Sequence, residues 1–157
     1  QNKKDSISFS QGAITSRYLN TCFVYYLMDD EKNKIQECQK ALNMMISLHE
    51  YEGEARYHSS LGIIYALLGK AEEAVRESKI GIALYPPSKD MFAHDHYLHK
   101  IGGVYLIIGD IDKSIDIIEK LLSEPSNFHW SDFKYDPLVR KRLMNNTRLM
   151  SQRSRLH

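Results

Sequence analysis

Residues 61–70 read LGIIYALLGK, and the stretch that they begin, 61–86, decides the fold. Gly69 predicts the end of a first helix, because glycine readily takes the left-handed conformation that stops a helix. A second helix is expected to follow at once and to end before the prolines at 86 and 87. Gly62 and Gly81 lie inside these helices, where glycine costs about 1 kcal/mol relative to alanine. We infer that the two helices approach closely and form a helical hairpin.

Composition limits the function classes. The chain has 157 residues, 43% of them hydrophobic, which suits one domain or one short repeat array. Its 21 basic and 20 acidic residues leave a net charge of +1, which favours neither nucleic acid nor an anionic membrane. No apolar run approaches the roughly 18 residues of a membrane span, so we expect no membrane insertion. Because the chain starts at Gln1, we expect it to be a fragment or a processed chain. We expect it to lie in the cytoplasm, or in the periplasm if a membrane segment precedes it.

The N-terminal part divides into a lead-in and a helical pattern. Residues 1–11 are polar without periodicity and are expected to be a linker or a disordered lead-in. From Gly12 the apolar residues fall at steps of three and four, which predicts an amphipathic helix. Asp29-Asp30 predicts a turn, and a second helix is expected over about 31–48. The apolar stripe of the first helix is Ile14, Tyr18, Thr21, Cys22, Tyr25 and Met28.

The sequence repeats with a period of forty residues. Three copies are expected, over 12–50, 52–88 and 90–125. Three sets of positions carry the register: the tyrosines Tyr25, Tyr65 and Tyr105, the turn residues Asp29, Gly69 and Gly109, and the small residues Cys22, Gly62 and Gly102. An aligned tyrosine with a turn residue four positions later in each copy is much less common by chance than apolar matching alone.

The motif Leu61-Gly62-x-x-Tyr65-x-x-x-Gly69, followed by Ala74 and closed by Pro86, resembles the tetratricopeptide repeat, and the copy that starts at Ile101 is similar. In the first copy Cys22, Asp29 and Lys34 replace the usual glycines and small residue, and the period here is longer than the thirty-four residues of the family. The resemblance implies an all-α, right-handed α-solenoid of three helical hairpins. It also implies a non-catalytic module that binds a peptide or a partner protein.

The C-terminal residues 129–157 are expected to form an extension with a capping helix and a basic tail. Residues 121–126, 133–137 and 146–149 look like the segment that closes the repeat region of many bacterial multidomain regulators. Those regulators carry winged-helix, nucleotide-cyclase or protein-kinase modules. The resemblance implies that the chain is part of a larger bacterial protein of signalling or transcription regulation, in which the repeats sense or scaffold.

The groove positions of the family, carried over to this sequence, predict a binding surface on the concave face. They are Leu19, Phe23, Tyr26, Arg56, Ser59, Ile63, His96, His99, Gly103 and Leu106. The aromatics lie towards one end, which favours an aromatic-anchored or apolar ligand with a polar contact at Arg56. No paired lysine and arginine clamp for a free carboxylate is visible. In the alternative interpretation, Phe23 and Tyr26 pack against the lead-in segment.

Three further functions compete with peptide binding. A ligand-sensing domain would have a pocket that converges on His96, His99 and Arg56. A metal site is sterically conceivable among His94, Asp95, His96 and His99, but exposed or groove-facing histidines are favoured, and no metal or cofactor is expected. Nucleic acid could bind the basic tail, but a cap formed by Leu138, Leu143 and Leu149 or Met150 is favoured. The basic tail residues are Arg140, Lys141, Arg142, Arg148, Arg153 and Arg155.

Two features remain open in the sequence. Cys22 and Cys38 lie on the two helices of the first hairpin, where a disulfide is geometrically possible but a pair of buried thiols is favoured. A homodimer is plausible through the end of the array near Trp130 and Phe133. No phosphate loop, nucleophile motif or zinc-protease signature occurs, so no catalysis is expected.

Overall fold

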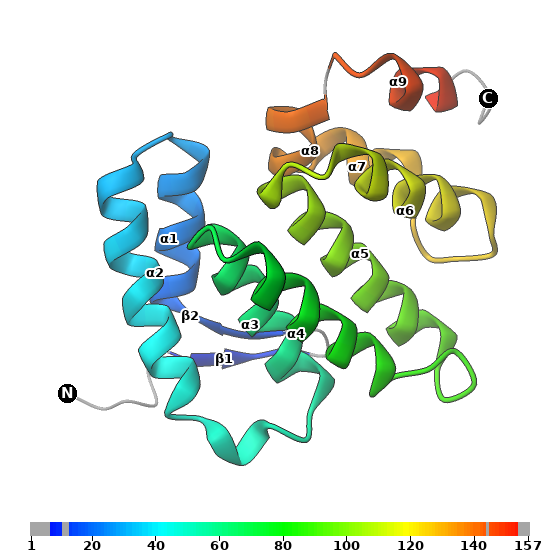
Figure 1. The fold of residues 1–157 in the computed structure, drawn as a ribbon. Coiled ribbons are helices and arrows are strands. Elements are labelled where there is room, and N and C mark those ends of the chain that lie inside the picture. Colours follow the sequence, from blue (N-terminus) through cyan, green and yellow to red (C-terminus); the bar gives the residue numbers. More distant parts are fainter. Residues whose placement is uncertain (1–6, 11–12, 144, 154–157) are drawn as a thin grey trace.

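The computed structural model of the protein describes residues 7–10, 13–143 and 145–153, and its fold is mostly helical, as predicted. In these residues, three pairs of consecutive helices follow a short two-stranded sheet, and three shorter helices come after them (Figure 1). The elements are β1 (Ile7–Phe9), β2 (Ile14–Ser16), α1 (Arg17–Leu27), α2 (Glu31–Ile46), the 3-10 turn η2 (His49–Tyr51), α3 (Ala55–Leu67), α4 (Ala71–Ala83), α5 (Met91–Ile108), α6 (Ile111–Ser123), α7 (Trp130–Tyr135), α8 (Pro137–Leu143) and α9 (Thr147–Arg153).

The forty-residue period recurs in the backbone of the three hairpin turns. In the described part of the chain, only Asp29, Gly69 and Gly109 have positive φ angles, of 59°, 75° and 90°. The next residue in each copy donates its N–H to the carbonyl of the repeated tyrosine, at 3.0 Å to Tyr25, 2.9 Å to Tyr65 and 2.9 Å to Tyr105. These bonds satisfy carbonyls that the helix end would leave unpaired. The same turn therefore ends α1, α3 and α5.

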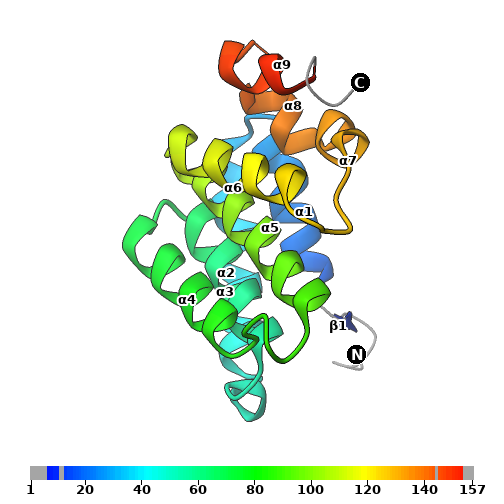
Figure 2. The ribbon, with the colours of Figure 1, turned by 90° about the vertical axis from the view of Figure 1, so that its right-hand side faces the viewer.

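The hairpins pack against their neighbours, with α3 in contact with α1 and α2 on one side and with α5 on the other. The predicted close approach within the second hairpin is confirmed. A Cβ atom at Gly62 would overlap Ser78 Oγ and would lie 3.1 Å from the carbonyl oxygen of Ala74 on α4. Figure 2 shows α3 and α4 side by side along their lengths.

The start of the chain differs from the prediction. The helix expected from Gly12 begins at Arg17, and Ile14 belongs to a strand that pairs antiparallel with β1. Ser16 sets this boundary, because its side chain accepts a hydrogen bond from Leu19 N at 3.1 Å and so caps the helix. Ile14 N in turn donates to Ser60 Oγ on α3, at 2.9 Å. Part of the expected lead-in, residues 7–9, is therefore a strand, whereas residues 1–6 lie outside the described part.

The C-terminal helices cover the third hairpin. We call the buried set that they form with α5 and α6 the C-terminal cluster: Leu106, Ile115, Ile118, Leu121, Phe133, Leu138, Val139, Leu143 and Leu149. Helix α8 contacts α5 and α1, and α9 contacts α6. The two helices lie together at one end of the molecule (Figure 1). Leu138, Leu143 and Leu149 thus pack where the predicted cap places them.

A disulfide joins Cys22 of α1 to Cys38 of α2, with 5.2 Å between their Cα atoms. Both residues are fully buried. The expectation of buried side chains is therefore confirmed, but the favoured interpretation of two free thiols is wrong. The bond is possible because the two helices of the hairpin bring the Cα atoms within the range that a disulfide spans.

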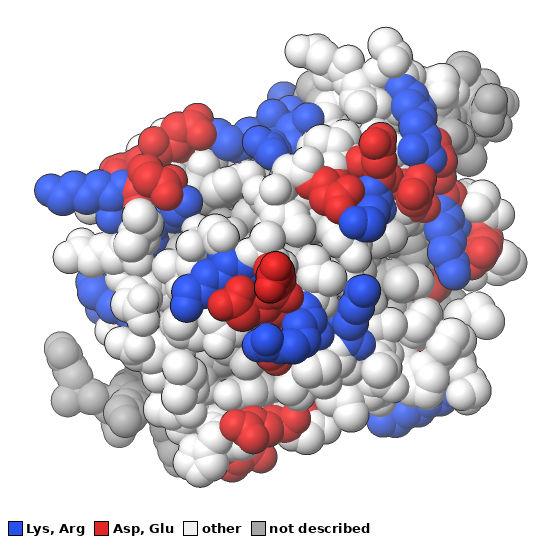
Figure 3. All heavy atoms as spheres, viewed as in Figure 1, with Lys and Arg blue, Asp and Glu red and all other residues white. Residues whose placement is uncertain are grey.

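Charges of both signs are mixed on the face that carries α2, α4 and α6. Figure 3 shows Lys and Arg beside Asp and Glu over each of these helices, without a broad patch of one sign. Several are ion pairs within one helix or turn, such as Lys34 with Glu31, at 2.7 Å, and Arg76 with Glu77, at 3.1 Å. This face gives no electrostatic reason to bind a polyanion.

Candidate functional site

The predicted groove residues lie on α1, α3 and α5, but not all of them are accessible. Leu19, Ser59 and Leu106 are buried, with exposed fractions of 5%, 3% and 2%. They therefore belong to the core and are not contacts for a ligand in this structure. The seven other predicted residues are half-buried: Phe23, Tyr26, Arg56, Ile63, His96, His99 and Gly103.

The segment around α7 and α8 covers the predicted groove along α5. The ring of His99 stacks on Phe128, with 4.8 Å between centroids, and lies 5.6 Å from the ring of Phe133. Arg142 Nε donates to the carbonyl of Leu106 at 3.0 Å, and Leu138 packs over Gly103. The C-terminal half of the predicted groove is therefore filled by the chain itself.

Phe23 and Tyr26 pack against two clusters of buried side chains. Both rings contact the C-terminal cluster as well as the core of the first two hairpins. Lys141 Nζ lies 5.7 Å from the centroid of the Tyr26 ring, and it donates to the carbonyl of Leu27 at 3.2 Å and to Asp29 Oδ1 at 2.6 Å. Intramolecular packing accounts for both aromatic rings, with partners in the C-terminal segment that the sequence did not suggest.

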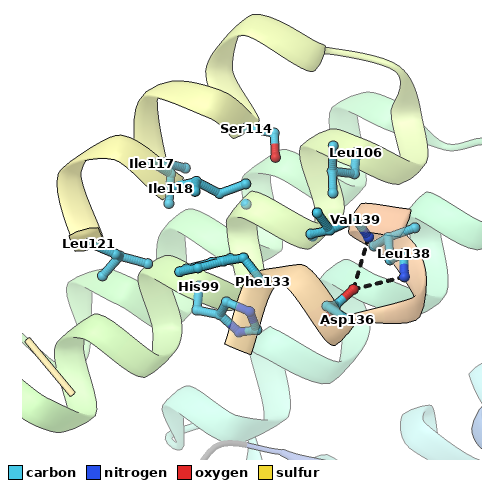
Figure 4. Close-up of a pocket in the computed structure, with 12 residues that line it drawn as sticks. His99, Leu106, Ser114, Ile117, Ile118, Leu121, Phe133, Asp136, Leu138 and Val139 are labelled. Carbon is cyan, nitrogen blue, oxygen red and sulfur yellow. Dashed lines mark hydrogen bonds between the residues drawn. The ribbon is translucent and has the colours of Figure 1, made fainter. Parts of the chain in front are cut away.

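A small cavity remains under the C-terminal segment (Figure 4). Its volume is about 30 Å³, which holds about one water molecule. Phe133, Ile118 and Leu121 line it, and the buried hydroxyl of Ser114 beside it has no hydrogen-bond partner among the described residues. Asp136 accepts hydrogen bonds from the N–H groups of Leu138 and Val139 at 2.7 and 2.9 Å, which fixes the start of α8. This cavity is too small for a metabolite.

Burial has altered the titration of the groups on this side of α5. Burial, together with the weaker effect of the positive charge of Lys100, lowers the pKa of His99 from 6.5 to about 4. Burial and Lys100 also lower the pKa of His96, and burial lowers the pKa of Lys100 itself. Each neutral form is favoured because a buried charge loses its hydration. His99 is consequently a neutral ring in the folded protein at pH 7.

The histidines of the conceivable metal site contact different parts of the chain. His94 Nδ1 lies 2.9 Å from the carbonyl oxygen of Tyr85, and Asp95 is buried, which raises the pKa of its carboxyl group. His99 packs against the rings of Phe128 and Phe133, which also contact each other. Among the residues that the structure describes, no group of three or more His, Cys, Asp or Glu side chains is arranged to hold a metal ion.

A second, larger hollow lies at the start of α3. Its volume is about 260 Å³, and its lining comes from the start of α3, the end of α4, the loop that follows and α5: Gly53, Glu54, Ala55, Arg56, Leu84, Tyr85, Lys89 and Tyr97. Arg56 is the one predicted site residue in this set. Its guanidinium lies over the rings of Phe9 and Tyr51, 5.2 and 5.9 Å from their centroids, and its Nε bonds to Glu54. We call this hollow the Arg56 pocket.

The sequence indicated only part of the Arg56 pocket. Arg56 was found because it holds a repeated groove position, which His96 holds one period later. Lys89 and Tyr85 were missed because they lie in the connection between repeats, where the forty-residue register carries no information on side chains. The only sequence signal was that both residues lie close to prolines 86 and 87, and such prolines indicate a turn rather than a binding site.

Part of the basic tail is held by acidic and carbonyl groups of the same chain. Arg148 Nη2 bonds to Asp116 Oδ1 and to Glu119 Oε2 of α6, both at 2.6 Å. Lys141 bonds to the last residue of α1 and to Asp29 in the turn that follows, and Arg142 bonds to α5, as described above. Three of the six basic residues therefore attach the cap, whereas the side chain of Arg153 and all of Arg155 lie outside the described residues.

Comparisons with protein-family models, with curated proteins and with solved structures found no match to this chain. Within the described residues, every helix is too short or too polar to cross a lipid bilayer. The fold and the site geometry are therefore the basis for the proposal that follows.

Proposed function

We propose that the chain is a non-catalytic protein–protein interaction module of the tetratricopeptide type, part of a larger bacterial regulatory protein. In this proposal the three hairpins form a short right-handed solenoid. The partner is a peptide segment that binds beside α3 and α5, where the chain leaves the predicted groove uncovered. Arg56, Ile63 and His96 are the contact residues retained from the sequence.

The observation that carries this proposal is the Arg56 pocket. It is an open hollow of about 260 Å³ that joins the predicted face to the connection between repeats. The exposed ring of Phe9 beside it adds apolar surface, with 45% of the residue exposed. An aromatic ring next to charged groups is typical of surfaces that bind protein segments. The repeated turns at Asp29, Gly69 and Gly109 support the repeat architecture that presents such a face.

The second candidate, a ligand-sensing domain, has less support. Its distinguishing feature is one pocket lined by His96, His99 and Arg56. His99 lines the cavity of about 30 Å³, whereas Arg56 lines the separate hollow at the start of α3, and neither lining includes His96. The separation of these residues favours a shallow, extended contact over a closed metabolite site.

The disulfide bears on the compartment. Structural disulfides persist mainly in oxidising compartments. The bond between Cys22 and Cys38 therefore favours the periplasm over the cytoplasm as the place of this module. The other partners we propose are further domains of the same polypeptide or a second copy of the chain.

Selection from a library of random linear peptides tests the proposal. The full chain is immobilised, enriched peptides are resynthesised with a fluorophore, and their affinities are measured by anisotropy. We expect saturable binding that weakens at least tenfold in an Arg56→Ala variant whose circular dichroism matches the wild type. Lys79→Ala is the matched control, because Lys79 is an exposed cation on α4 away from the pocket. Failure to enrich any peptide, or equal binding by both variants, would overturn the proposal.

A further inference from the structure

The Arg56 pocket combines two cations with aromatic walls. Arg56 and Lys89 supply the positive charges, Glu54 supplies one negative charge, and Tyr85 and Tyr97 supply rings. Lys89 Nζ lies 4.2 Å from the centroid of the Tyr85 ring. Arg56 reaches the pocket from α3 and Lys89 from the loop after α4, so only the folded chain brings them together.

Within the part of the chain that the structure describes, both cations have hydrogen-bond donors without an acceptor. Glu54 engages Nε of Arg56, and the terminal guanidinium nitrogens have no acceptor in the described residues. Lys89 likewise forms no ion pair with any described residue. With one carboxylate against two cations, the pocket has a net positive charge and at least two groups that can donate to an incoming oxygen. Arginine and lysine bind carboxylate oxygens through such charge-assisted bonds.

The start of α3 adds to the positive potential. The N-cap residue Glu54 makes no side-chain capping bond, because its carboxylate is turned to Arg56. Glu54, Ala55 and Arg56, which form the positive end of the helix dipole, all line the pocket. The helix end, the guanidinium and the ammonium group therefore act on the same small volume.

We propose that the Arg56 pocket binds a carboxylate of the partner peptide, held between Arg56 and Lys89 with its carbon atoms against Tyr85 and Tyr97. The carboxylate comes from an acidic side chain or from the chain end, since both present the same two oxygens. This inference rests on the proposed peptide-binding function, and it names the chemical group of the peptide that the pocket recognises. The hollow of about 260 Å³ is large enough for one such group and excludes a folded domain.

The sequence pattern predicted the absence of a paired lysine and arginine. That pattern considered only groove positions on the first helix of each pair. The pair arises because the turn at prolines 86 and 87 carries Lys89 back towards the start of α3.

Three short peptides test the chemistry in two-dimensional amide NMR on the full chain. Ala-Glu-Ala with both ends blocked carries the side-chain carboxylate, Ala-Ala-Ala with a free carboxyl end carries the chain end, and blocked Ala-Gln-Ala is the neutral control. Each is added up to about 10 mM, because one small charged contact supplies affinity in the millimolar range. We expect saturable shifts at residues 53–56 and 84–90 with at least one acidic peptide and none with the neutral control.

Two variants then distinguish binding in the pocket from a general effect of the protein's charge on peptide affinity. Lys89→Met is expected to weaken the carboxylate affinity at least fivefold, whereas Lys79→Met, which removes an exposed cation elsewhere, leaves it unchanged. Equal shifts with the neutral peptide, or equal affinity in Lys89→Met, would overturn the carboxylate site.

The peptide-library experiment distinguishes failure of the carboxylate site from failure of the proposed peptide-binding function. If the enriched peptides lack acidic groups and bind Lys89→Met as tightly as the wild type, the chain is an interaction module without a carboxylate site. If the short acidic peptides bind but no library peptide is enriched, the pocket is a carboxylate site and the proposed peptide-binding function is wrong.

Discussion

At Gly62 the helices α3 and α4 leave no room for a side chain. A Cβ atom there would overlap Ser78 Oγ and would lie 3.1 Å from Ala74 O and 3.3 Å from Ser78 N, both backbone atoms of α4. We expect Gly62→Ala to lower the free energy of unfolding by about 1–3 kcal/mol, because the helices must move apart. Urea unfolding followed by circular dichroism measures the change.

Two controls isolate this contact. Gly53 is exposed, and a Cβ atom there would have nothing within 4 Å, so Gly53→Ala should change stability by less than about 0.5 kcal/mol. Adding Ser78→Ala to Gly62→Ala removes the nearest atom and should recover part of the loss. An unchanged stability in Gly62→Ala would show that the helices can separate without cost.

His99 makes stability depend on pH. Its pKa is about 4 in the folded protein and near the ordinary 6.5 when the chain is unfolded. Between these values the unfolded chain binds the extra proton, so stability is complete above about pH 6.5 and falls as the pH falls towards 4. The full shift corresponds to about 3 kcal/mol. We expect urea unfolding at pH 7 and pH 4.5 to show most of this loss.

The variant His99→Leu separates this effect from the titration of carboxyl groups. Its stability should fall less between the two pH values than that of the wild type. His49→Gln, which changes an exposed histidine, should keep the wild-type dependence. The same pH dependence in His99→Leu and in the wild type would contradict the burial of His99 as a neutral ring.

At the scale of elements, the disulfide fixes α1 to α2. Cys22 and Cys38 close a loop with a sequence separation of 16 residues, for which chain entropy predicts about 3 kcal/mol of stabilisation. We expect dithiothreitol to lower the midpoint of thermal unfolding of the wild type. A Cys22→Ala, Cys38→Ala variant should start at the lower midpoint and should not respond to the reductant. A wild-type midpoint that is the same with and without reductant would contradict the bond.

The helices that follow a strong local signal were predicted well from the sequence. Gly69, Gly109 and Asp29 marked the turns, and the structure ends α1, α3 and α5 within two residues of them. The β1–β2 pair was not predicted, because the apolar step from Ile14 to Tyr18 also fits a helix. Ile14 is held in a strand by a hydrogen bond to Ser60, which lies 46 residues away and leaves no local signal.

The candidate site was harder to predict than the elements. The site residues carried over from the family pattern lie on α1, α3 and α5, and the pattern assumed an open groove along these helices. Phe128, Phe133 and Leu138 fill its C-terminal half, and their docking depends on shape complementarity between distant segments. Lys89 was missed because it lies in the connection between repeats and shares a pocket with Arg56 only in the folded chain.

For the whole molecule, the C-terminal segment completes the core. Removing residues 126–157 would uncover Leu106, Ile118 and Leu121, whose exposed fractions are now 2%, 3% and 1%. We expect the shortened chain to self-associate or to lose fixed structure, because an apolar face of this kind is unstable in water. Sedimentation velocity and circular dichroism measure both outcomes.

A milder change keeps the test informative if the shortened chain does not fold. Leu149→Ala removes a fully buried side chain of α9 and should cost about 2–5 kcal/mol. Thr147→Ala, at an exposed position of the same helix, should cost much less. A stable, monomeric chain without residues 126–157 would contradict an integral role of the cap.

Lys141 connects the last part of the chain to the first, with Nζ bonded to Asp29 across 112 residues of sequence. A linear array in which each repeat contacts only its neighbours can lose structure from one end while the other end persists. This contact, with α8 packed on both α1 and α5, joins the first hairpin to the third through the C-terminal segment. Backbone amides of the first and third hairpins should therefore exchange with solvent deuterium at similar free energies of opening, as parts of one cooperative unit.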